Sequence, residues 1–122
     1  MGLVDVSRAA RFHVSVSDRE CAVVMTQGEG PDYVVVALMG RDFSVTEQSW
    51  PEAERLLAAA SWGVRRLAKY TMYLPAIEIA LPNAGLVACV KLHDVHAKLQ
   101  AWILELQSYG CSFVDGQGAW EL

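Results

Sequence analysis

The stretch AIEIALPNAGLVACVKL, residues 76–92, decides the fold because it holds two apolar runs around one turn signal. The runs AIEIAL and LVACVKL each have the length of a buried strand. Between them, Pro82, Asn83 and Gly85 supply residues that favour a tight reversal of the chain. The stretch therefore predicts a hairpin of two antiparallel strands.

The N-terminal part of the chain predicts three further strands. Residues 11–17 alternate apolar and polar side chains, which is typical of a half-buried strand. The turn DRE leads into a second strand over Cys21–Gln27, and GEGPD precedes a third over Tyr33–Met39. We expect these three strands to form an antiparallel meander.

A helix follows the meander. Ser49 is a favourable N-cap, Glu52 completes a capping box, and Pro51 is tolerated in the first turn. The apolar spacing continues beyond Gly63 and predicts a helix that ends near Tyr70. The alternative is that Gly63 ends the helix.

The last helix is expected over Val95–Tyr109, with Asp94 as its N-cap and Gly110 at its end. A small hairpin is expected around residues 115–118. The element order is β-β-β-α-β-β-α within a single domain, residues 1–122. This order predicts the α+β class, with an antiparallel sheet and two helices packed on one face.

Composition narrows the function. The chain is 53% hydrophobic and 20% charged, so it can bury a core. Its net charge of −4 makes nucleic acid an unfavourable partner. The longest apolar run, Tyr33–Met39, is too short to cross a bilayer, so no membrane partner is expected. Three cysteines without a close pair favour reduced thiols and a cytoplasmic location.

The segment KLHDVH, residues 91–96, is the strongest candidate for a metal site. Together with Cys89, it could offer His93, Asp94 and His96 as ligands. No second ligand pair occurs elsewhere in the sequence, and Asp94 is better explained as a helix cap. We therefore expect a strand-to-helix joint, with no metal and no cofactor.

Catalytic residues are not predicted. Cys21, His13 and Asp18 belong to one expected hairpin, but no nucleophile motif supports them. We therefore expect a protein without enzymatic activity rather than an enzyme.

The first helix offers a candidate partner-binding surface. If that helix passes Gly63, Trp62 lies opposite the apolar stripe and among basic residues, which is the composition of a binding hot spot. The predicted set is Trp62, Arg55, Arg65, Arg66 and Lys69. If the helix stops at Gly63, Trp62 turns into the core instead.

The last helix offers a second surface. Ala97, Ala101 and Leu104 form a narrow stripe opposite its broad apolar face. Small residues allow another helix to approach closely, so this stripe favours a homodimer through these residues.

In element order, the chain resembles the small chaperones that bind type III secretion effectors. That resemblance implies a dimeric, cytosolic α+β protein without a catalytic site. We therefore expect a non-enzymatic protein-binding module with a chaperone or adaptor role, whose partner is another protein. The alternatives are an inhibitor or immunity protein and a small-ligand-binding domain.

Overall fold

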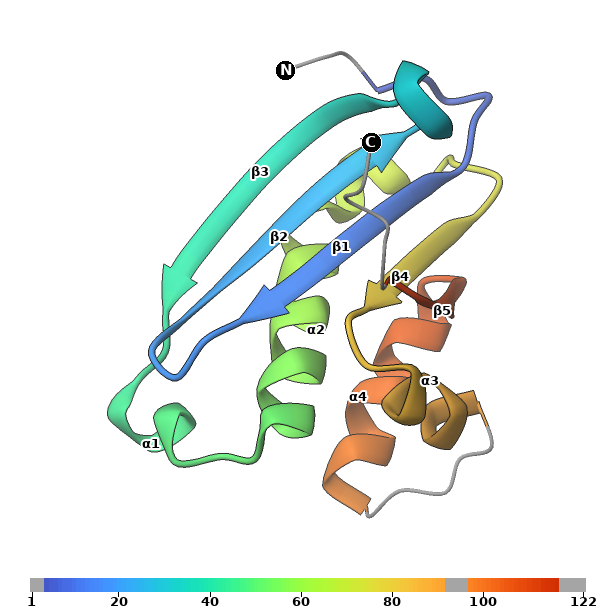
Figure 1. Ribbon diagram of the computed structural model, residues 1–122. Coiled ribbons are helices and arrows are strands. Elements are labelled where there is room, and N and C mark those ends of the chain that lie inside the picture. The colour runs from blue at the N-terminus through green and yellow to red at the C-terminus, as the bar shows by residue number, and fades with distance from the viewer. Residues whose placement is uncertain (1–3, 92–96, 117–122) are drawn as a thin grey trace.

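The computed structural model describes residues 4–91 and 97–116 of the chain (Figure 1). Five strands form one sheet: β1 (Ala10–Val16), β2 (Glu20–Gln27), β3 (Val34–Asp42), β4 (Ile77–Leu81) and β5 (Cys111–Asp115). The helices are α1 (Val45–Gln48), α2 (Glu52–Thr71), α3 (Ala84–Lys91) and α4 (Ala97–Ser108), with a short 3-10 turn η1 (Gly30–Asp32). No helix in these ranges is both long enough and apolar enough to span a membrane.

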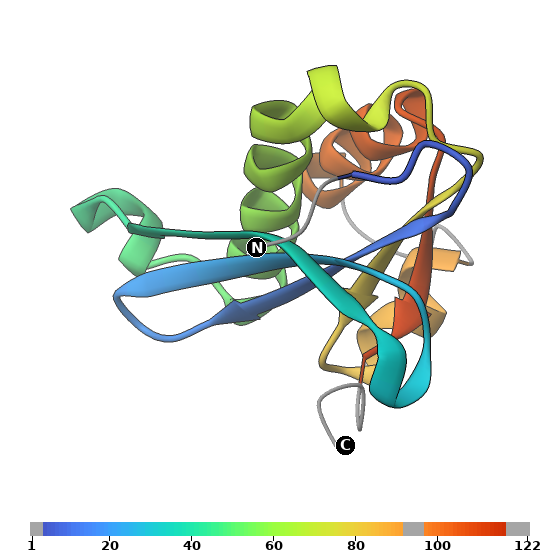
Figure 2. The ribbon, with the colours of Figure 1, turned by 90° about the horizontal axis from the view of Figure 1, so that it is seen from above.

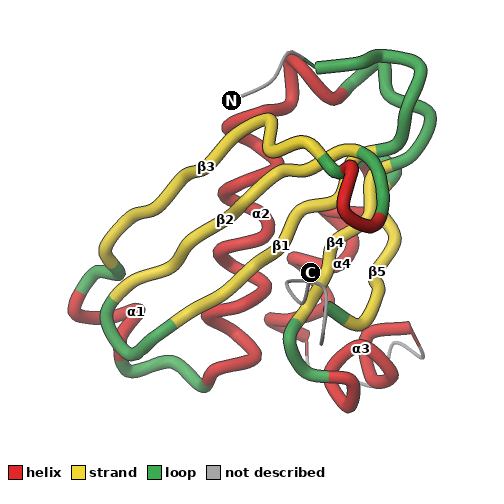
Figure 3. The backbone as a smooth tube through the Cα atoms, turned by 45° about the horizontal axis from the view of Figure 1, so that its top comes forward, coloured by secondary structure: helices red, strands yellow, loops and turns green. Residues whose placement is uncertain are grey.

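The sheet is mixed, with strand order β3-β2-β1-β4-β5 (Figure 3). β1, β2 and β3 form the expected antiparallel meander. β4, however, pairs parallel with β1, and β5 pairs parallel with β4. The expectation of a purely antiparallel sheet with two helices is therefore wrong.

The error lies in residues 76–92. AIEIAL forms β4, but the following run is α3 and not a strand. The Asn83 side chain accepts a hydrogen bond from the backbone N–H of Leu86 at 3.0 Å, as an N-cap does, so it starts a helix and not a hairpin. A short apolar run fits a buried strand or a buried helix equally well, and periodicity alone cannot separate them. Because the chain continues through helices, it crosses over and adds β5 in parallel.

The described helices α2 and α4 lie on one face of the sheet (Figures 1 and 2). The core between these layers is continuous. Its largest fully buried side chains include Phe12, Met25, Leu56, Leu57, Ile79, Leu81, Ile103 and Leu106. The last helix matches its expected position, whereas its predicted cap, Asp94, lies outside the described residues. Residues 111–115, where the expected terminal hairpin would begin, form β5.

The sequence left open whether the first helix passes or ends at Gly63; in the structure it passes, since α2 runs without a break from Glu52 to Thr71. Its predicted capping box is wrong: Pro51 is the N-cap and offers no side-chain hydrogen bond. The structure has a capping box one helix earlier, where Ser44 and Glu47 start α1. Glu47 therefore has a structural role that the sequence reading missed.

Gly63 allows α2 to approach β2 closely. A Cβ atom at this position would lie 2.8 Å from Cγ1 of Val23, whose side chain is fully buried. Gly63→Ala should therefore lower the free energy of unfolding by about 1–2 kcal/mol, because overpacking outweighs the gain in helix propensity. Urea denaturation measures this change. In a Val23→Ala background only the 3.3 Å contact with the Cβ atom of residue 23 remains, so the same substitution should cost much less. An equal loss in both backgrounds would contradict this account.

Candidate functional site

Two parallel strands define the first candidate site. The chain leaves β1 toward β2 on one side, and β5 joins β4 on the other, so the strand order reverses between β1 and β4. Ligands of open α/β sheets bind outside the carboxyl ends of the strands at such a reversal. The arrowheads of both strands point toward the end of the molecule where α2 begins (Figure 1). We call this place the switch point and define it by residues 15–18, 50–55 and 81–83.

Arg55 is the central charged group of the switch point. Its side chain is only 11% exposed. Its Nε donates a hydrogen bond to the carbonyl oxygen of Trp50 at 3.1 Å, and its Nη1 donates one to the carbonyl oxygen of Ser17. Its Nη2 lies 4.0 Å from a carboxylate oxygen of Asp18, whose own side chain is fully exposed. Arg55 thus ties the start of α2 to the end of β1.

Glu54, the next residue of α2, is also committed to an ion pair. Its side chain is 9% exposed and lies 3.2 Å from Nζ of Lys98 on α4. The same ammonium group lies 3.7 Å from the ring centroid of Trp50 and 5.6 Å from that of Trp102. Lys98 therefore neutralises the carboxylate and holds α4 against the start of α2.

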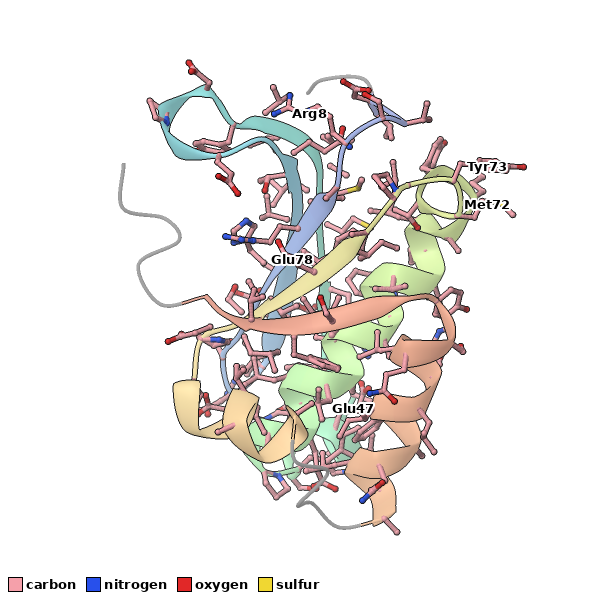
Figure 4. All side chains as sticks on the ribbon, turned by 90° about the vertical axis from the view of Figure 1, so that its right-hand side faces the viewer. Arg8, Glu47, Met72, Tyr73 and Glu78 are labelled. Atoms are coloured by element: carbon pink, nitrogen blue, oxygen red, sulfur yellow. The ribbon has the colours of Figure 1, made fainter. Side chains whose placement is uncertain are left out.

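Arg41 and Glu47 form a bidentate ion pair beside this region, with N–O distances of 2.8 and 2.9 Å. The hydrogen bond from Arg41, together with weaker contributions from the charge of Arg41 and from Ser44, lowers the pKa of Glu47 to about 2 against the effect of burial. The Arg41 guanidinium also lies 5.6 Å from the ring centroid of Trp62. Figure 4 places Glu47 at the end of the molecule where α2 begins.

Glu47→Gln should lower the free energy of unfolding at neutral pH by about 2 kcal/mol, since it removes a charged bidentate pair. The folded pKa lies below the unfolded value. The stability from ionised Glu47 is therefore present above pH 4.5 and is lost as the pH falls toward 2. Denaturant titrations between pH 2 and 7 should show a shallower acid slope in the variant. Parallel curves for the two proteins would contradict this assignment.

The second candidate surface lies at the opposite end of α2. It consists of Arg66, Lys69, Tyr70, Met72 and Tyr73, and we call it the α2 end surface. All five side chains are exposed, including Tyr73 at 73% and Met72 at 67%. Within the described ranges, neither Arg66 nor Lys69 takes part in an ion pair. Figure 4 shows Met72 and Tyr73 at the outer edge of the molecule.

The structure divides the predicted partner-binding set. Arg65, Arg66 and Lys69 are exposed, and Arg65 pairs with Glu105 of α4 at 2.8 Å. Trp62 is half-buried and packs against the core, and Arg55 is buried at the other end of the helix. Two aromatic residues, Tyr70 and Tyr73, and one thioether, Met72, accompany the exposed basic residues. They were not predicted from the sequence as partner-binding residues. The cluster KYTMY after two arginines was the available signal.

The remaining predicted residues are not brought together. Cys21 is buried in the core, whereas His13 lies on the opposite face of β1 and contacts the Thr26 hydroxyl at 3.0 Å. Burial raises the pKa of the Cys21 thiol, which does not favour a nucleophile.

The last helix keeps its stripe. Ala97, Ala101 and Leu104 are exposed on one face of α4, and a contact between two copies through them stays a prediction. The prediction of a strand that ends at KLHDVH is wrong, because Ala84–Lys91 form helix α3. His93, Asp94 and His96 lie outside the described residues.

The face of the sheet away from α2 carries a mixed polar group. Arg11 on β1 pairs with Glu78 on β4 at 3.0 Å. A hollow beside this pair is lined by residues that include Arg8, Thr26 and Glu29. Figure 4 labels Arg8 and Glu78 on this side. Opposite charges alternate here, so this hollow is less suited to an anionic polymer than the α2 end surface.

Comparison with known families gives one match over most of the chain. The family described as the RNase H-like domain found in reverse transcriptase matches residues 5–109. No curated protein matches in sequence.

Solved structures share the fold. The protease-reverse transcriptase of prototype foamy virus aligns with a TM-score of 0.72 and 15% identity, over 93% of this chain and 16% of that one. RNase H1 from Halobacterium salinarum aligns with a TM-score of 0.61 and 13% identity, over 93% and 87%. The nuclease domain of human cytomegalovirus terminase, soaked with Mn, aligns with a TM-score of 0.52 and 13% identity, over 84% and 43%.

The foamy viral protein has also been solved with nucleic acid. One structure is a complex with double-stranded DNA (TM-score 0.68, 15% identity, 91% of this chain) and another a complex with an RNA/DNA hybrid (TM-score 0.61, 14% identity, 91%). This chain spans 20% and 15% of those two chains.

Three expectations from the sequence are corrected by these matches. The chaperone-like, non-enzymatic module is wrong, because the matching family is an RNase H-like domain of reverse transcriptases. The expectation that the chain is no enzyme is wrong for the same reason, since RNase H1 and a nuclease domain share its fold. The expectation that nucleic acid is an unfavourable partner is wrong, because structural neighbours are solved on DNA and on an RNA/DNA hybrid. The net charge was a poor guide to the partner because it sums all charges of the chain and does not report local basic surfaces.

The manganese in one neighbour raises the question of a metal site in this chain. Nucleases with two divalent ions require several carboxylates that converge on one place. In residues 4–91 and 97–116, no group of three or more histidine, cysteine, aspartate or glutamate side chains could hold a metal ion. At the switch point, Glu54 is paired with Lys98, and Asp18 lies beside Arg55. The described residues therefore do not fit a two-metal centre there.

Proposed function

Because the chain belongs to the family of RNase H-like domains found in reverse transcriptase, we propose that it binds nucleic acid duplexes as one domain of such a protein. The family match over residues 5–109 is the observation that carries this proposal. The named complexes of the foamy viral protein favour double-stranded DNA and the RNA/DNA hybrid as ligands. Both are polyanions that present regularly spaced phosphates.

The α2 end surface is the proposed contact. Arg66 and Lys69 offer two cations without carboxylate partners among the described residues, in a chain whose net charge is −4. Lys and Arg bind phosphate oxygens, and tyrosine rings can pack against sugars or unpaired bases. Lys69 also lies 5.0 Å from the ring centroid of Tyr70, so cation and ring lie together. Arg66 and Lys69, two exposed members of the predicted partner-binding set, thus contact nucleic acid in this proposal.

Fluorescence anisotropy with a labelled RNA/DNA hybrid of about 16 base pairs tests the proposal. We expect saturable binding that weakens as salt increases, since phosphate contacts release counterions. Double-stranded DNA of the same sequence, titrated in parallel, ranks the two ligands. No binding of either duplex at low salt would refute the proposal.

Hydrolysis of nucleic acid is a second candidate function, favoured by the neighbours named as RNase H1 and as a nuclease domain. Metal-dependent hydrolysis would need ligands from outside the described residues, where the sequence holds His93, Asp94 and His96. Incubating the labelled hybrid with Mn²⁺, with and without EDTA, tests it. Cleavage that EDTA abolishes and His93→Ala or Asp94→Asn reduces would support this candidate.

A cytoplasmic location is also proposed. Cys21 and Cys111 are free and buried, and burial raises the pKa of the Cys111 thiol to about 12. Buried, protonated thiols persist without oxidation in a reducing compartment.

A further inference from the structure

The carboxyl ends of β1 and β4 are the place where this sheet should receive a ligand. The side chains at these ends are small or uncharged: Ser15 lies near the end of β1 and Ser17 follows it, and Pro82 and Asn83 follow β4. The Asn83 oxygen is already used to cap α3. Residues 15–17 and 81–83 therefore offer an ion no carboxylate ligand.

The positive charge of the switch point is Arg55. Its guanidinium donates to two backbone carbonyl oxygens, those of Ser17 and Trp50, which come from two separate segments. It also lies 6.0 Å from the ring centroid of Phe43 and 4.0 Å from Asp18. An arginine stays charged at any pH at which the protein folds. A divalent cation placed beside it would meet a fixed like charge.

Two of the three switch-point carboxylates lie beside this chain's own cations, whereas Glu52 is exposed and takes part in no ion pair among the described residues. Glu54 is buried against Lys98, and the ammonium is held in turn by the rings of Trp50 and Trp102. Asp18 has Arg55 as its neighbour. A metal ion would have to displace Lys98 to gain Glu54, and at Asp18 it would meet the Arg55 guanidinium, which lies 4.0 Å from that carboxylate.

We infer that the Arg55 guanidinium, and not a divalent metal ion, is the positive charge around which the switch point is built. It ties β1 to α2 through its hydrogen bonds to the carbonyl oxygens of Ser17 and Trp50. The nucleic acid contact proposed above is accordingly independent of metal at the switch point. The first part of this inference, that no divalent ion binds at the switch point (the metal part), is independent of the proposed function. The second part, that nucleic acid binding needs no metal there (the binding part), rests on the proposed function.

Titration of the full chain with Mn²⁺, followed by electron paramagnetic resonance of the free ion, tests the metal part. Two double variants, Asp18→Asn with Glu52→Gln and Glu54→Gln with Glu52→Gln, together remove the three switch-point carboxylates while keeping side-chain size, and circular dichroism confirms that each variant is folded. We expect both variants to bind the same amount of Mn²⁺ as the parent chain. If both variants keep a bound Mn²⁺ ion, that ion lies outside the switch point, and the inference is supported. Loss of a bound ion, or a tenfold weaker site, in either variant would overturn it.

The binding part is tested with the labelled hybrid in Mn²⁺ and in EDTA at equal ionic strength. We expect the two dissociation constants to agree within twofold. A loss of tenfold or more in EDTA would overturn the binding part. If the hybrid does not bind under either condition, the proposed function fails, while the Mn²⁺ titration still decides the metal part.

Discussion

Replacing Arg55 with methionine should lower the free energy of unfolding by about 3 kcal/mol. Methionine keeps most of the side-chain length but has no donor, so the carbonyl oxygens of Ser17 and Trp50 lose their partner. Both hydrogen bonds are part-buried, and a hydrogen bond with a charged donor contributes about 1.5–3 kcal/mol, so the loss of both gives a destabilisation of about this size. Urea denaturation followed by tryptophan fluorescence measures the loss.

Arg19→Met is the matched control, since Arg19 is exposed in the adjacent turn between β1 and β2. It should change the free energy of unfolding by less than about 0.5 kcal/mol. Equal effects of the two substitutions would show that Arg55 does not link β1 to α2. Because Arg55 lies at the far end of α2 from Lys69, a folded Arg55→Met protein should keep the hybrid affinity of the parent chain.

Reversing both free charges of the α2 end surface, with Arg66→Glu and Lys69→Glu, should weaken hybrid binding by about tenfold or more. Each lost phosphate contact removes a favourable charge interaction and reduces the salt slope by about one. The double variant should therefore bind more weakly and with a slope smaller by about two. Anisotropy titrations at several salt concentrations give both numbers.

Arg19→Glu is the control for long-range charge effects. It changes the net charge as Arg66→Glu does, but at the end of the molecule where α2 begins. We expect Arg19→Glu to weaken binding less than Arg66→Glu does. If Arg19→Glu weakens binding as much, the effect comes from net charge alone, and the α2 end surface is not the contact.

The first half of the fold follows from the sequence because its signals are local. Alternating residues in β1 and β2 and the turns between the strands are matched by the structure. The apolar spacing allowed a long helix across Gly63 but could not decide it, because a glycine can also end a helix; here it serves a close contact with Val23.

The second half could not be predicted in the same way. In PNAGLVACV, Asn83 is as good a helix cap as a turn residue, and the apolar run has no distinguishing period. Whether β4 pairs with β1 in parallel is a long-range property set by packing of α2 and α4 on the sheet. One helix read as a strand was enough to change the fold class and, with it, the expected function.

The candidate sites show the same division. The exposure of Arg65, Arg66 and Lys69 followed from helical geometry. The burial of Arg55 did not, because its partners are backbone carbonyl oxygens, whose positions depend on the tertiary fold. The net charge of −4 argued against nucleic acid as a partner. That expectation failed because a net charge does not tell where on the surface each charge lies.

The most direct test of nucleic acid binding is a titration of the isotopically labelled chain with the unlabelled RNA/DNA hybrid, observed by amide nuclear magnetic resonance. At 122 residues, the chain is small enough for residue-specific assignment. The account predicts chemical-shift changes concentrated at Arg66, Lys69, Tyr70 and Tyr73, with the amides of residues 15–18 unaffected by adding Mn²⁺. Unchanged spectra with excess hybrid, or changes confined to other surfaces, would contradict it.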